Sequence, residues 1–159
     1  MSPAELLDLV SKLCGRYPVV SPEDVLHEDG WPNWGEASRC LGQGRGLTGD
    51  DLFATDLPRF CTGMSSGVAN IVLVKPDQAG RLSRAGTVLK AVQANANATV
   101  ASARSGGTED YWLADLTVGW RAEQAKVGSA QCSGRTAKWD GLLEIQADAG
   151  GKAGLRWKA

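Results

Sequence analysis

Apolar positions along the chain form short unbroken runs that alternate with longer segments of helical spacing. The clearest run is Ile71 to Val74, which is followed at once by Lys75 and Pro76. A strand covered on both faces shows no polar alternation, so this run predicts a buried strand that ends at Lys75. Residues 82–95 then carry apolar side chains at helical spacing and predict a helix after the strand.

The same alternation extends over most of the chain. Further strands are expected at residues 17–20, 47–52, 98–103 and 124–127. A capping box at residues 2–5 predicts a first helix that runs to residue 14. Further helices are expected at residues 31–41, 55–64 and 133–148, and another is expected to begin after a cap at residues 108–110. This order predicts an α/β domain over residues 1–148, with a flexible tail over residues 149–159.

A charged residue stands at or just after the end of each predicted strand. Subtraction of their positions gives intervals of 22 to 29 residues, and each interval holds one predicted helix. Such βα units build a parallel barrel or a doubly wound sheet, and they bring the carboxyl ends of the strands to one edge. We therefore expect these charges to meet there. The alternative is that they are isolated charges on the surface. The residues concerned are Glu23, Asp50, Lys75, Arg104 and Lys126.

Composition limits the range of functions. The chain has 159 residues, of which 43% are hydrophobic and 22% charged, which suits one globular domain but falls short of the roughly 250 residues of a complete α/β barrel. A net charge of -1 without a basic stripe disfavours nucleic acid and anionic membranes as partners. Four scattered cysteines indicate reduced, buried thiols, and with no leader or membrane span in the pattern the cytoplasm is the expected location.

The residues expected at the carboxyl edge combine two acids with several cations. Acids of this kind can hold a hard divalent cation such as Mg²⁺, and the cations can hold a small phosphorylated carboxylate. A lysine among other positive charges loses its proton more readily, which makes Lys75 or Lys126 a candidate general base. The alternative for Lys75 is a side chain that merely extends into solvent at a strand end.

Seven short segments resemble one known family. In chain order they are SPED at 21–24, GDDL at 49–52, LVKPDQAG at 73–80, SARSGGTED at 102–110, ADLTVG at 114–119, AKVGS at 125–129 and SGRTAKWDGLLEI at 133–145. Together they are similar to the carboxyl-terminal barrel segment of enolase, and the resemblance covers residues 4–146. The resemblance implies a partial TIM-type (β/α) barrel with about five βα units.

Enolases reversibly dehydrate 2-phosphoglycerate to phosphoenolpyruvate with two Mg²⁺ ions, and a lysine removes the proton next to the carboxylate. By motif position the resemblance implies that Glu23 and Asp50 are metal ligands and that Lys75 is the proton-abstracting base. It also implies that Lys126 contacts the substrate carboxylate. Supporting positions implied in the same way are Asp24, Asp51, Gln78 and Asp110.

The same comparison of motifs implies that Arg104 and Ser105 contact the phosphate and the second metal ion. Enolases place a histidine before this arginine, whereas Ala103 stands here, so one substrate-contacting side chain is missing. The family patterns SIED, KVNQ and SGETED read SPED, KPDQ and SGGTED in this chain. The pocket beside the base is therefore expected to differ from that of the family.

Several parts of an enolase have no counterpart in these residues: the amino-terminal domain, the first barrel strands, the third metal-binding aspartate, the acid that protonates the leaving hydroxyl and the mobile serine loop. Five strands cannot close an eight-stranded barrel, so we expect a homo-oligomer or a companion chain to supply the other half. The open alternatives are an enolase-like lyase, a non-catalytic binding module and a lyase for another phosphorylated or phosphonate acid. His27 is expected in a solvated loop, unless that loop reaches the substrate.

Overall fold

Four short parallel strands form the sheet in the computed structural model, which describes residues 1–150. They are β1 (Thr48–Gly49), β2 (Ile71–Val74), β3 (Ala98–Ser102) and β4 (Gln124–Lys126), and they lie in that spatial order. Ile71 pairs with Ala98, and Ser102 pairs with Lys126. The carboxyl ends of all four strands therefore point to the same edge, as the sequence predicted.

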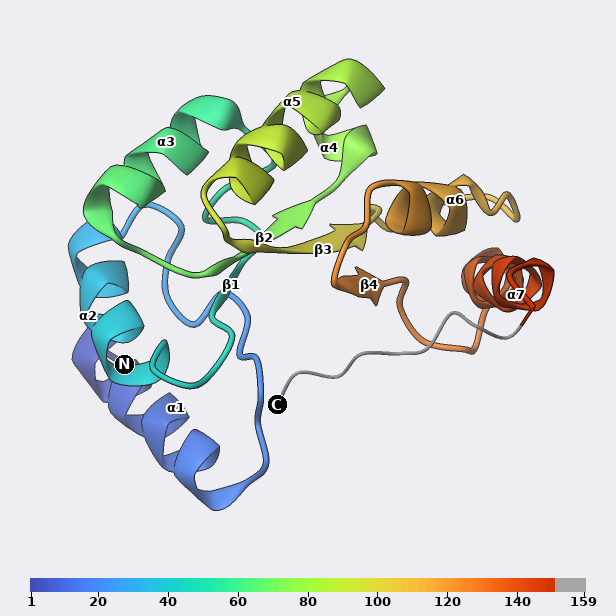
Figure 1. Cartoon of the computed structure of the whole chain (residues 1–159). Helices are drawn as coiled ribbons and strands as arrows, with labels where there is room; N and C mark the ends of the chain where they lie inside the picture. The colour runs from blue at the N-terminus through green and yellow to red at the C-terminus, as the bar shows by residue number, and fades with distance from the viewer. Residues whose placement is uncertain (151–159) are drawn as a thin grey trace.

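Helices cover the outer side of this sheet. They are α1 (Pro3–Arg16), α2 (Trp31–Leu41), α3 (Leu57–Ser66), α4 (Pro76–Ala79), α5 (Leu82–Ala94), α6 (Trp112–Gly119) and α7 (Ser133–Asp148). Figure 1 shows them along an open arc, with α1 and α2 at one end and α6 and α7 at the other. Helix α5 contacts both β2 and β3, while α6 contacts β3 and α7. The predicted α/β class with a parallel sheet is confirmed.

The helix ends follow from the sequence. Ser2 and Glu5 form the predicted capping box at α1, in which the Glu5 N–H donates to the Ser2 hydroxyl and the Ser2 N–H donates to the Glu5 carboxylate. Asp56 caps α3 by accepting the Arg59 N–H at 3.0 Å. Gly67 ends α3 in the left-handed region, at φ 64°, where a residue without a Cβ is least strained.

Both faces of β2 are buried, which confirms the interpretation of the unbroken apolar run. Val72 and Val74 pack into the main core under the helices, whereas Leu73 lies in a second cluster with Ile71 and Val100 on the other face. Burial of one such side chain contributes about 1.5 to 3 kcal/mol. The largest fully buried side chains of the main core are Trp34, Phe53 and Phe60.

The predicted first strand, residues 17–20, is not a strand in the structure. Tyr17 and Val20 are exposed, and at the end of the segment the Val20 carbonyl accepts a hydrogen bond from Gly46 N–H. The pairing continues only beyond the segment, where Thr48 N–H donates to the Pro22 carbonyl and Asp24 N–H donates to the Thr48 carbonyl. Glu23 then forms a single bridge with Thr48. The physical reason is that β1 begins only at Thr48, opposite Glu23, so residues 17–20 have no strand of the described sheet beside them and no ladder develops. The sheet accordingly has four strands where five were expected.

Other expectations need smaller corrections. The strand predicted over residues 47–52 is limited to β1, because the chain turns directly after Gly49. Residues 108–110 do not cap α6, whose N-cap is Tyr111 without a side-chain hydrogen bond. Three of the four cysteines, which were expected to be buried, are exposed, and only Cys14 is inside.

Two further expectations concern the carboxyl-terminal tail and a membrane span. Most of the predicted flexible tail, residues 149–159, lies outside the described residues, so the predicted domain boundary stays a prediction. Among residues 1–150, no helix combines the length and the apolar character needed to span a membrane.

Candidate active site

Four of the six predicted site residues meet at the carboxyl edge of the sheet. Asp50 follows β1, Lys75 follows β2, and their side chains form an ion pair with Nζ at 2.6 Å from Oδ2. Lys126, the last residue of β4, lies 3.4 Å from the same oxygen and also pairs with Glu23. The predicted convergence of charges from separate strands is therefore observed for Glu23, Asp50, Lys75 and Lys126.

The Asp50 carboxylate is buried, and its two oxygens have different surroundings. Oδ2 accepts hydrogen bonds from both lysines, while Oδ1 is buried without a hydrogen-bond partner in residues 1–150. Carboxylate oxygens of Glu23, Asp24 and Asp50 lie within 4.8 Å of one another. Oxygen donors of this kind, with one buried oxygen still lacking a partner, fit a hard divalent cation such as Mg²⁺.

Asp24 holds the loop that carries Asp50. Its two carboxylate oxygens accept the backbone N–H groups of Asp50 and Asp51, each at 3.0 Å. Burial raises the pKa of Asp24, and the two N–H donors offset only part of that rise. Its own backbone has φ 43°, a left-handed conformation that aspartate adopts more readily than most residues. Asp24 thus fixes the position from which Asp50 meets the lysines.

Lys75 is held from both its backbone and its side chain. Its N–H donates to the buried Thr55 hydroxyl at 2.9 Å, and that hydroxyl donates to the Gln78 amide oxygen at 2.9 Å. The Lys75 side chain is only 13% exposed and ends on Asp50. Lys75 is therefore an ordered, ion-paired side chain and does not simply extend into solvent.

Lys126 lies further out than Lys75, since 46% of its side chain is exposed. Burial by itself would lower the pKa of Lys126, but the hydrogen bond and charge of Glu23, together with Asp50, outweigh it and raise the pKa above its ordinary value. Lys126 is therefore held as a cation in this arrangement. A lysine held in its charged form is poorly suited to accept a proton.

Beside these residues lies a cavity of about 620 Å³. Arg104 and Ser105 line it from the loop after β3, where both side chains are exposed, and Ala103 lines it just before them. The Arg104 N–H donates to the Asp77 carboxylate at 2.7 Å, which fixes the start of this loop against α4. Arg104 and Ser105 thus face the same cavity as the lysines, and Arg104 is held by Asp77, separately from the ion pairs of Glu23 and Asp50.

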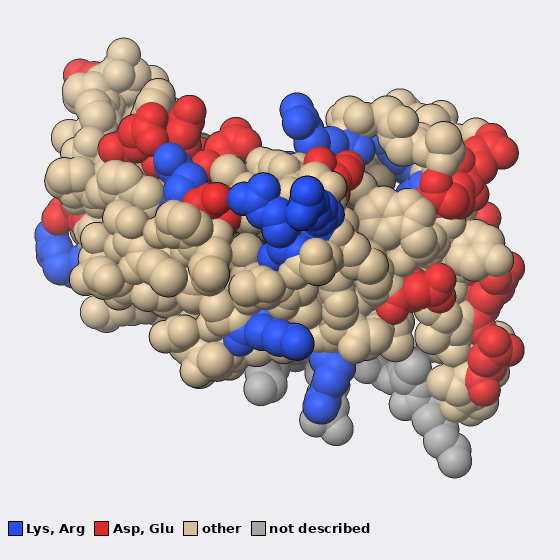
Figure 2. All heavy atoms as spheres, turned by 90° about the horizontal axis from the view of Figure 1, so that it is seen from above, with Lys and Arg blue, Asp and Glu red and all other residues tan. Residues whose placement is uncertain are grey.

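The walls of the cavity are strongly cationic. Five basic residues line it, against the single acid Asp51: Lys75, Lys126, Lys138, Arg104 and Arg135. Seen from above, Figure 2 shows basic and acidic side chains intermingled beside a hollow between the main body and the end formed by α6 and α7. The three lysines are ion-paired with acids behind the lining, so Arg104 and Arg135 offer the most accessible positive charge to an anionic ligand such as a phosphorylated carboxylate.

Two of these cations, Arg135 and Lys138, were not singled out from the sequence. Lys138 is 5% exposed and lies on the buried face of α7 together with Gly134 and Gly141. These three positions follow the spacing i, i+4, i+7 of one helix face. That spacing was available in the sequence, but the face carries two glycines and a lysine, so no apolar stripe marks it.

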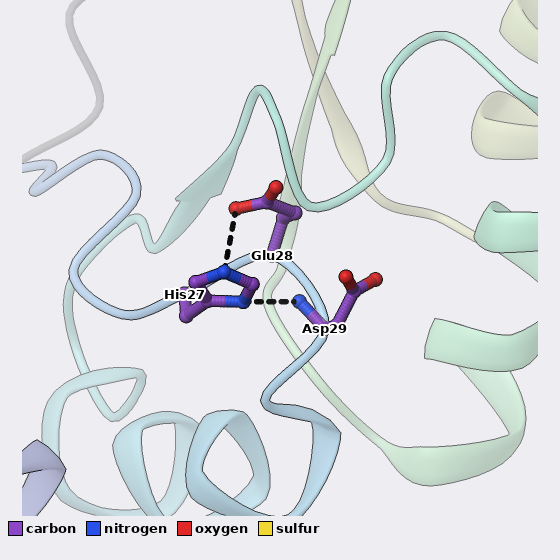
Figure 3. Close-up of side chains that lie close together, drawn as sticks. All are labelled: His27, Glu28 and Asp29. Carbon is purple, nitrogen blue, oxygen red and sulfur yellow. Dashed lines mark hydrogen bonds and ion pairs between the residues drawn. The ribbon is translucent and has the colours of Figure 1, made fainter.

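His27 lies in an exposed loop, as expected. Figure 3 shows its ring between its two sequence neighbours: Nδ1 accepts the Asp29 N–H at 3.1 Å, and Nε2 lies 3.7 Å from the Glu28 carboxylate. The His27 side chain is 72% exposed and does not line the cavity. The alternative that this loop brings His27 to the substrate is not supported in this structure.

Comparison with known proteins places the chain in one family. Residues 1–158 match the family described as "Enolase, C-terminal TIM barrel domain". The chain is similar to the enolase of Bdellovibrio bacteriovorus, with 41% identity over 157 residues, which is 99% of this chain and 37% of that protein. It is also similar to the enolase of Sulfurimonas denitrificans, with 41% identity over 143 residues, or 90% of this chain and 34% of that protein. The chain thus spans little more than a third of the length of the curated relatives it matches, and its arc of βα units is a partial barrel.

Proposed function

Because the chain belongs to the enolase family through its C-terminal TIM barrel domain, we propose that it takes part in the Mg²⁺-dependent, reversible dehydration of 2-phosphoglycerate to phosphoenolpyruvate. The observation that carries the proposal is the state of Asp50. One of its oxygens is shared by two lysines, and the other is buried without a partner in the described residues. This is a charge arrangement that a divalent cation and an anionic substrate would complete.

Glu23 and Asp50 are the proposed ligands of Mg²⁺, with Asp24 beside them. Asp24 already uses both carboxylate oxygens on backbone N–H groups, so its proposed role is to position Asp50. When bound, Mg²⁺ would supply positive charge that stabilises the enolate formed from the substrate carboxylate. The buried Asp50 oxygen without a partner in the described residues, with carboxylate oxygens of Glu23 and Asp24 within 4.8 Å, supports this assignment.

Lys75 is the proposed base. It would take the proton from the substrate carbon next to the carboxylate, a step for which its nitrogen must first be neutral. Its Nζ lies 2.6 Å from the Asp50 carboxylate, and a divalent cation held by Asp50 would compete with Lys75 for that carboxylate. The Thr55 hydroxyl, which accepts the Lys75 N–H, would hold the base in place during this exchange.

The remaining cations are proposed to bind the substrate. Lys126, held in its charged form, would contact the carboxylate, and Arg104 with Ser105 would contact the phosphate. All three residues line the same cavity as Lys75. The proposed arrangement gathers the base and the two anion-binding groups around one cavity.

The acid that would protonate the leaving hydroxyl is not among the enolase-like motifs of this chain. We propose that a second copy or a companion chain, supplying the other half of the barrel, contributes it. Removal of the proton and loss of the hydroxyl are then separable, because the first needs only the residues named above. Exchange of the substrate proton with solvent reports the first step alone.

A second candidate is a non-catalytic enolase-like binding module, and the observation that favours it is Ala103. Ala103 lines the cavity where the family has a histidine, so a polar contact to the substrate is replaced by a methyl group. The same change would suit a third candidate, enolase-type chemistry on another phosphorylated or phosphonate acid. Both candidates keep the anion site and differ from the first in the reaction.

The test follows 2-phosphoglycerate with the purified chain and Mg²⁺ in D₂O. Deuterium at the carbon next to the carboxylate is measured by NMR, and phosphoenolpyruvate by its ultraviolet absorbance. Lys75→Met removes the base, and Lys12→Met is the matched control, because Lys12 also pairs with an aspartate but lies exposed on α1. We expect exchange that requires Mg²⁺, persists in Lys12→Met and is lost in Lys75→Met.

The outcomes separate the candidates. Exchange without phosphoenolpyruvate would support the proposed base and locate the missing acid in another chain. Exchange that persists in Lys75→Met would contradict the assignment of the base. A folded sample that binds 2-phosphoglycerate without exchanging its proton would overturn the lyase proposal in favour of the binding module, and turnover of a different phosphorylated acid would favour the third candidate.

A further inference from the structure

The loop between β3 and α6 carries Arg104 and Ser105, and both side chains are exposed. At its start, the Arg104 N–H is anchored on Asp77. If this hydrogen bond alone held the loop between its two chain ends, the exposed side chains could sample many positions. Ordering those side chains when a ligand binds would then cost conformational entropy. A second anchor further along the loop would therefore matter for any ligand that uses Arg104 and Ser105.

Lys138 provides such an anchor from α7. Its Nζ donates to the Thr108 carbonyl at 2.6 Å and lies 3.5 Å from the Asp110 carboxylate, and its side chain is only 6% exposed. A buried ammonium is costly unless it is hydrogen-bonded and paired, and these two groups are the partners that the loop supplies. The buried lysine and the far end of the loop thus hold each other.

Close packing of α7 against the loop reinforces this contact. At Gly134, one turn before Lys138, an added Cβ would lie 2.9 Å from the Gly107 carbonyl oxygen and 3.3 Å from that of Thr108. Only a residue without a side chain allows the helix and the loop to approach this closely. Gly134 and Lys138 therefore form one docking face for residues 107–110.

We propose that Lys138 is a positioning residue that docks the end of the β3–α6 loop on α7 and so keeps Arg104 and Ser105 at the cavity. The inference rests on the proposed function only in taking Arg104 and Ser105 as contacts to an anionic substrate. Lys138 acts through the loop, because its ammonium is already bonded to the Thr108 carbonyl. The docking itself can be tested without any activity.

Limited trypsin digestion measures the docking, since Arg104 is an exposed cleavage site within the loop. Cleavage after Arg104 is compared with cleavage after Lys90, which lies in α5 and reports unfolding of the main body. In Lys138→Met we expect cleavage after Arg104 to rise about tenfold or more, with cleavage after Lys90 unchanged. Lys138→Arg, which keeps a charged donor, should restore most of the protection.

Two further variants make the result decisive. Gly134→Ala should raise cleavage after Arg104 while Lys138 is retained, and so shows that the assay detects undocking of the loop. Lys12→Met removes an exposed lysine–aspartate pair and should change neither site. An unchanged rate after Arg104 in Lys138→Met would overturn the proposal, and so would an equal rise at both sites, because that would mean a purely global effect on stability.

Protection by 2-phosphoglycerate with Mg²⁺ links the docking to function. In the unmodified chain we expect this ligand to slow cleavage after Arg104, and in Lys138→Met a concentration about tenfold higher should be needed for the same protection. If Lys138→Met loosens the loop but 2-phosphoglycerate protects neither protein, the proposed function fails and the docking role stands. If the ligand protects both proteins equally, Lys138 has no role in positioning the anion contacts.

Discussion

Replacement of Asp50 by asparagine is the sharpest perturbation of the site. Asp50 faces two lysines with a side chain that is 8% exposed, and Lys75 beside it is 13% exposed. The asparagine amide keeps the volume but removes the negative charge that both ammonium groups share. Loss of one partner from a buried pair costs about 3 to 5 kcal/mol, because the other charge is left uncompensated.

This cost is large against the stability of an ordinary domain, and urea denaturation measures it directly. With an m value of about 2 kcal/mol/M, the midpoint of Asp50→Asn should fall by about 1.5 to 2.5 M. Adding Lys75→Met to Asp50→Asn removes the uncompensated ammonium and should recover about 2 kcal/mol or more of the loss. Lys126→Met is the matched control: its side chain is 46% exposed, so its loss should cost about 1 kcal/mol or less.

Titration with Mg²⁺ then separates stability from metal binding. Mg²⁺ at ten times its dissociation constant should stabilise the unmodified chain by about 1.4 kcal/mol and leave Asp50→Asn unchanged. A midpoint for Asp50→Asn within about 0.5 M of the unmodified chain would refute the argument that the two lysines depend on this carboxylate. Equal stabilisation of both proteins by Mg²⁺ would remove Asp50 from the proposed ligands.

Three further predictions concern the helices. Gly86→Ala in α5 adds a Cβ in open space and should raise the free energy of unfolding by about 0.5 to 1 kcal/mol. Gly63→Ala in α3 would place a Cβ 2.5 Å from the buried Phe53 ring and should lower the free energy of unfolding by about 1 to 3 kcal/mol. Urea midpoints check both variants, and midpoints that shift in the same direction would contradict the packing described for these two glycines. Hydrogen bonds from the Ser2 backbone and side chain lower the pKa of Glu5 in the folded chain. The stability that the ionised Glu5 carboxylate gives to α1 is therefore complete above the ordinary glutamate pKa of about 4.3, and it is lost as the pH falls through the lowered pKa of the folded state. Carboxyl ¹³C NMR should show this low midpoint, and an ordinary value would argue against the capping box.

Sequence patterns predicted the parts of the fold that depend on neighbouring residues. The run from Ile71 to Val74 predicted a strand with both faces buried, and the structure has it with those bounds. The capping box at Ser2 predicted the start of α1. The positions of Asp50, Lys75 and Lys126 followed from strand ends alone, because parallel strands align their carboxyl ends whatever the details of packing.

Features that depend on distant partners were missed. Residues 17–20 have strand composition, but strand formation requires a ladder, and β1 pairs with Glu23, beyond the end of this segment. Pro76 is a different case, because its signal is local: proline ends the strand and, at the first helical position, also begins the short α4. Lys138 is buried because a loop carbonyl from another unit reaches it, and no local pattern contains that information.

The site also shows how the sheet is shaped. β1 and β4 are not neighbours, since two strands lie between them, yet Lys126 at the end of β4 reaches both Asp50 after β1 and Glu23, 103 residues away in sequence. Side chains from the first and fourth strands can meet only if the sheet curves toward them, as barrel strands do. Lys126 is too exposed for its ion pairs to impose that curvature. The charged cluster therefore depends on the curvature of the sheet and does not cause it.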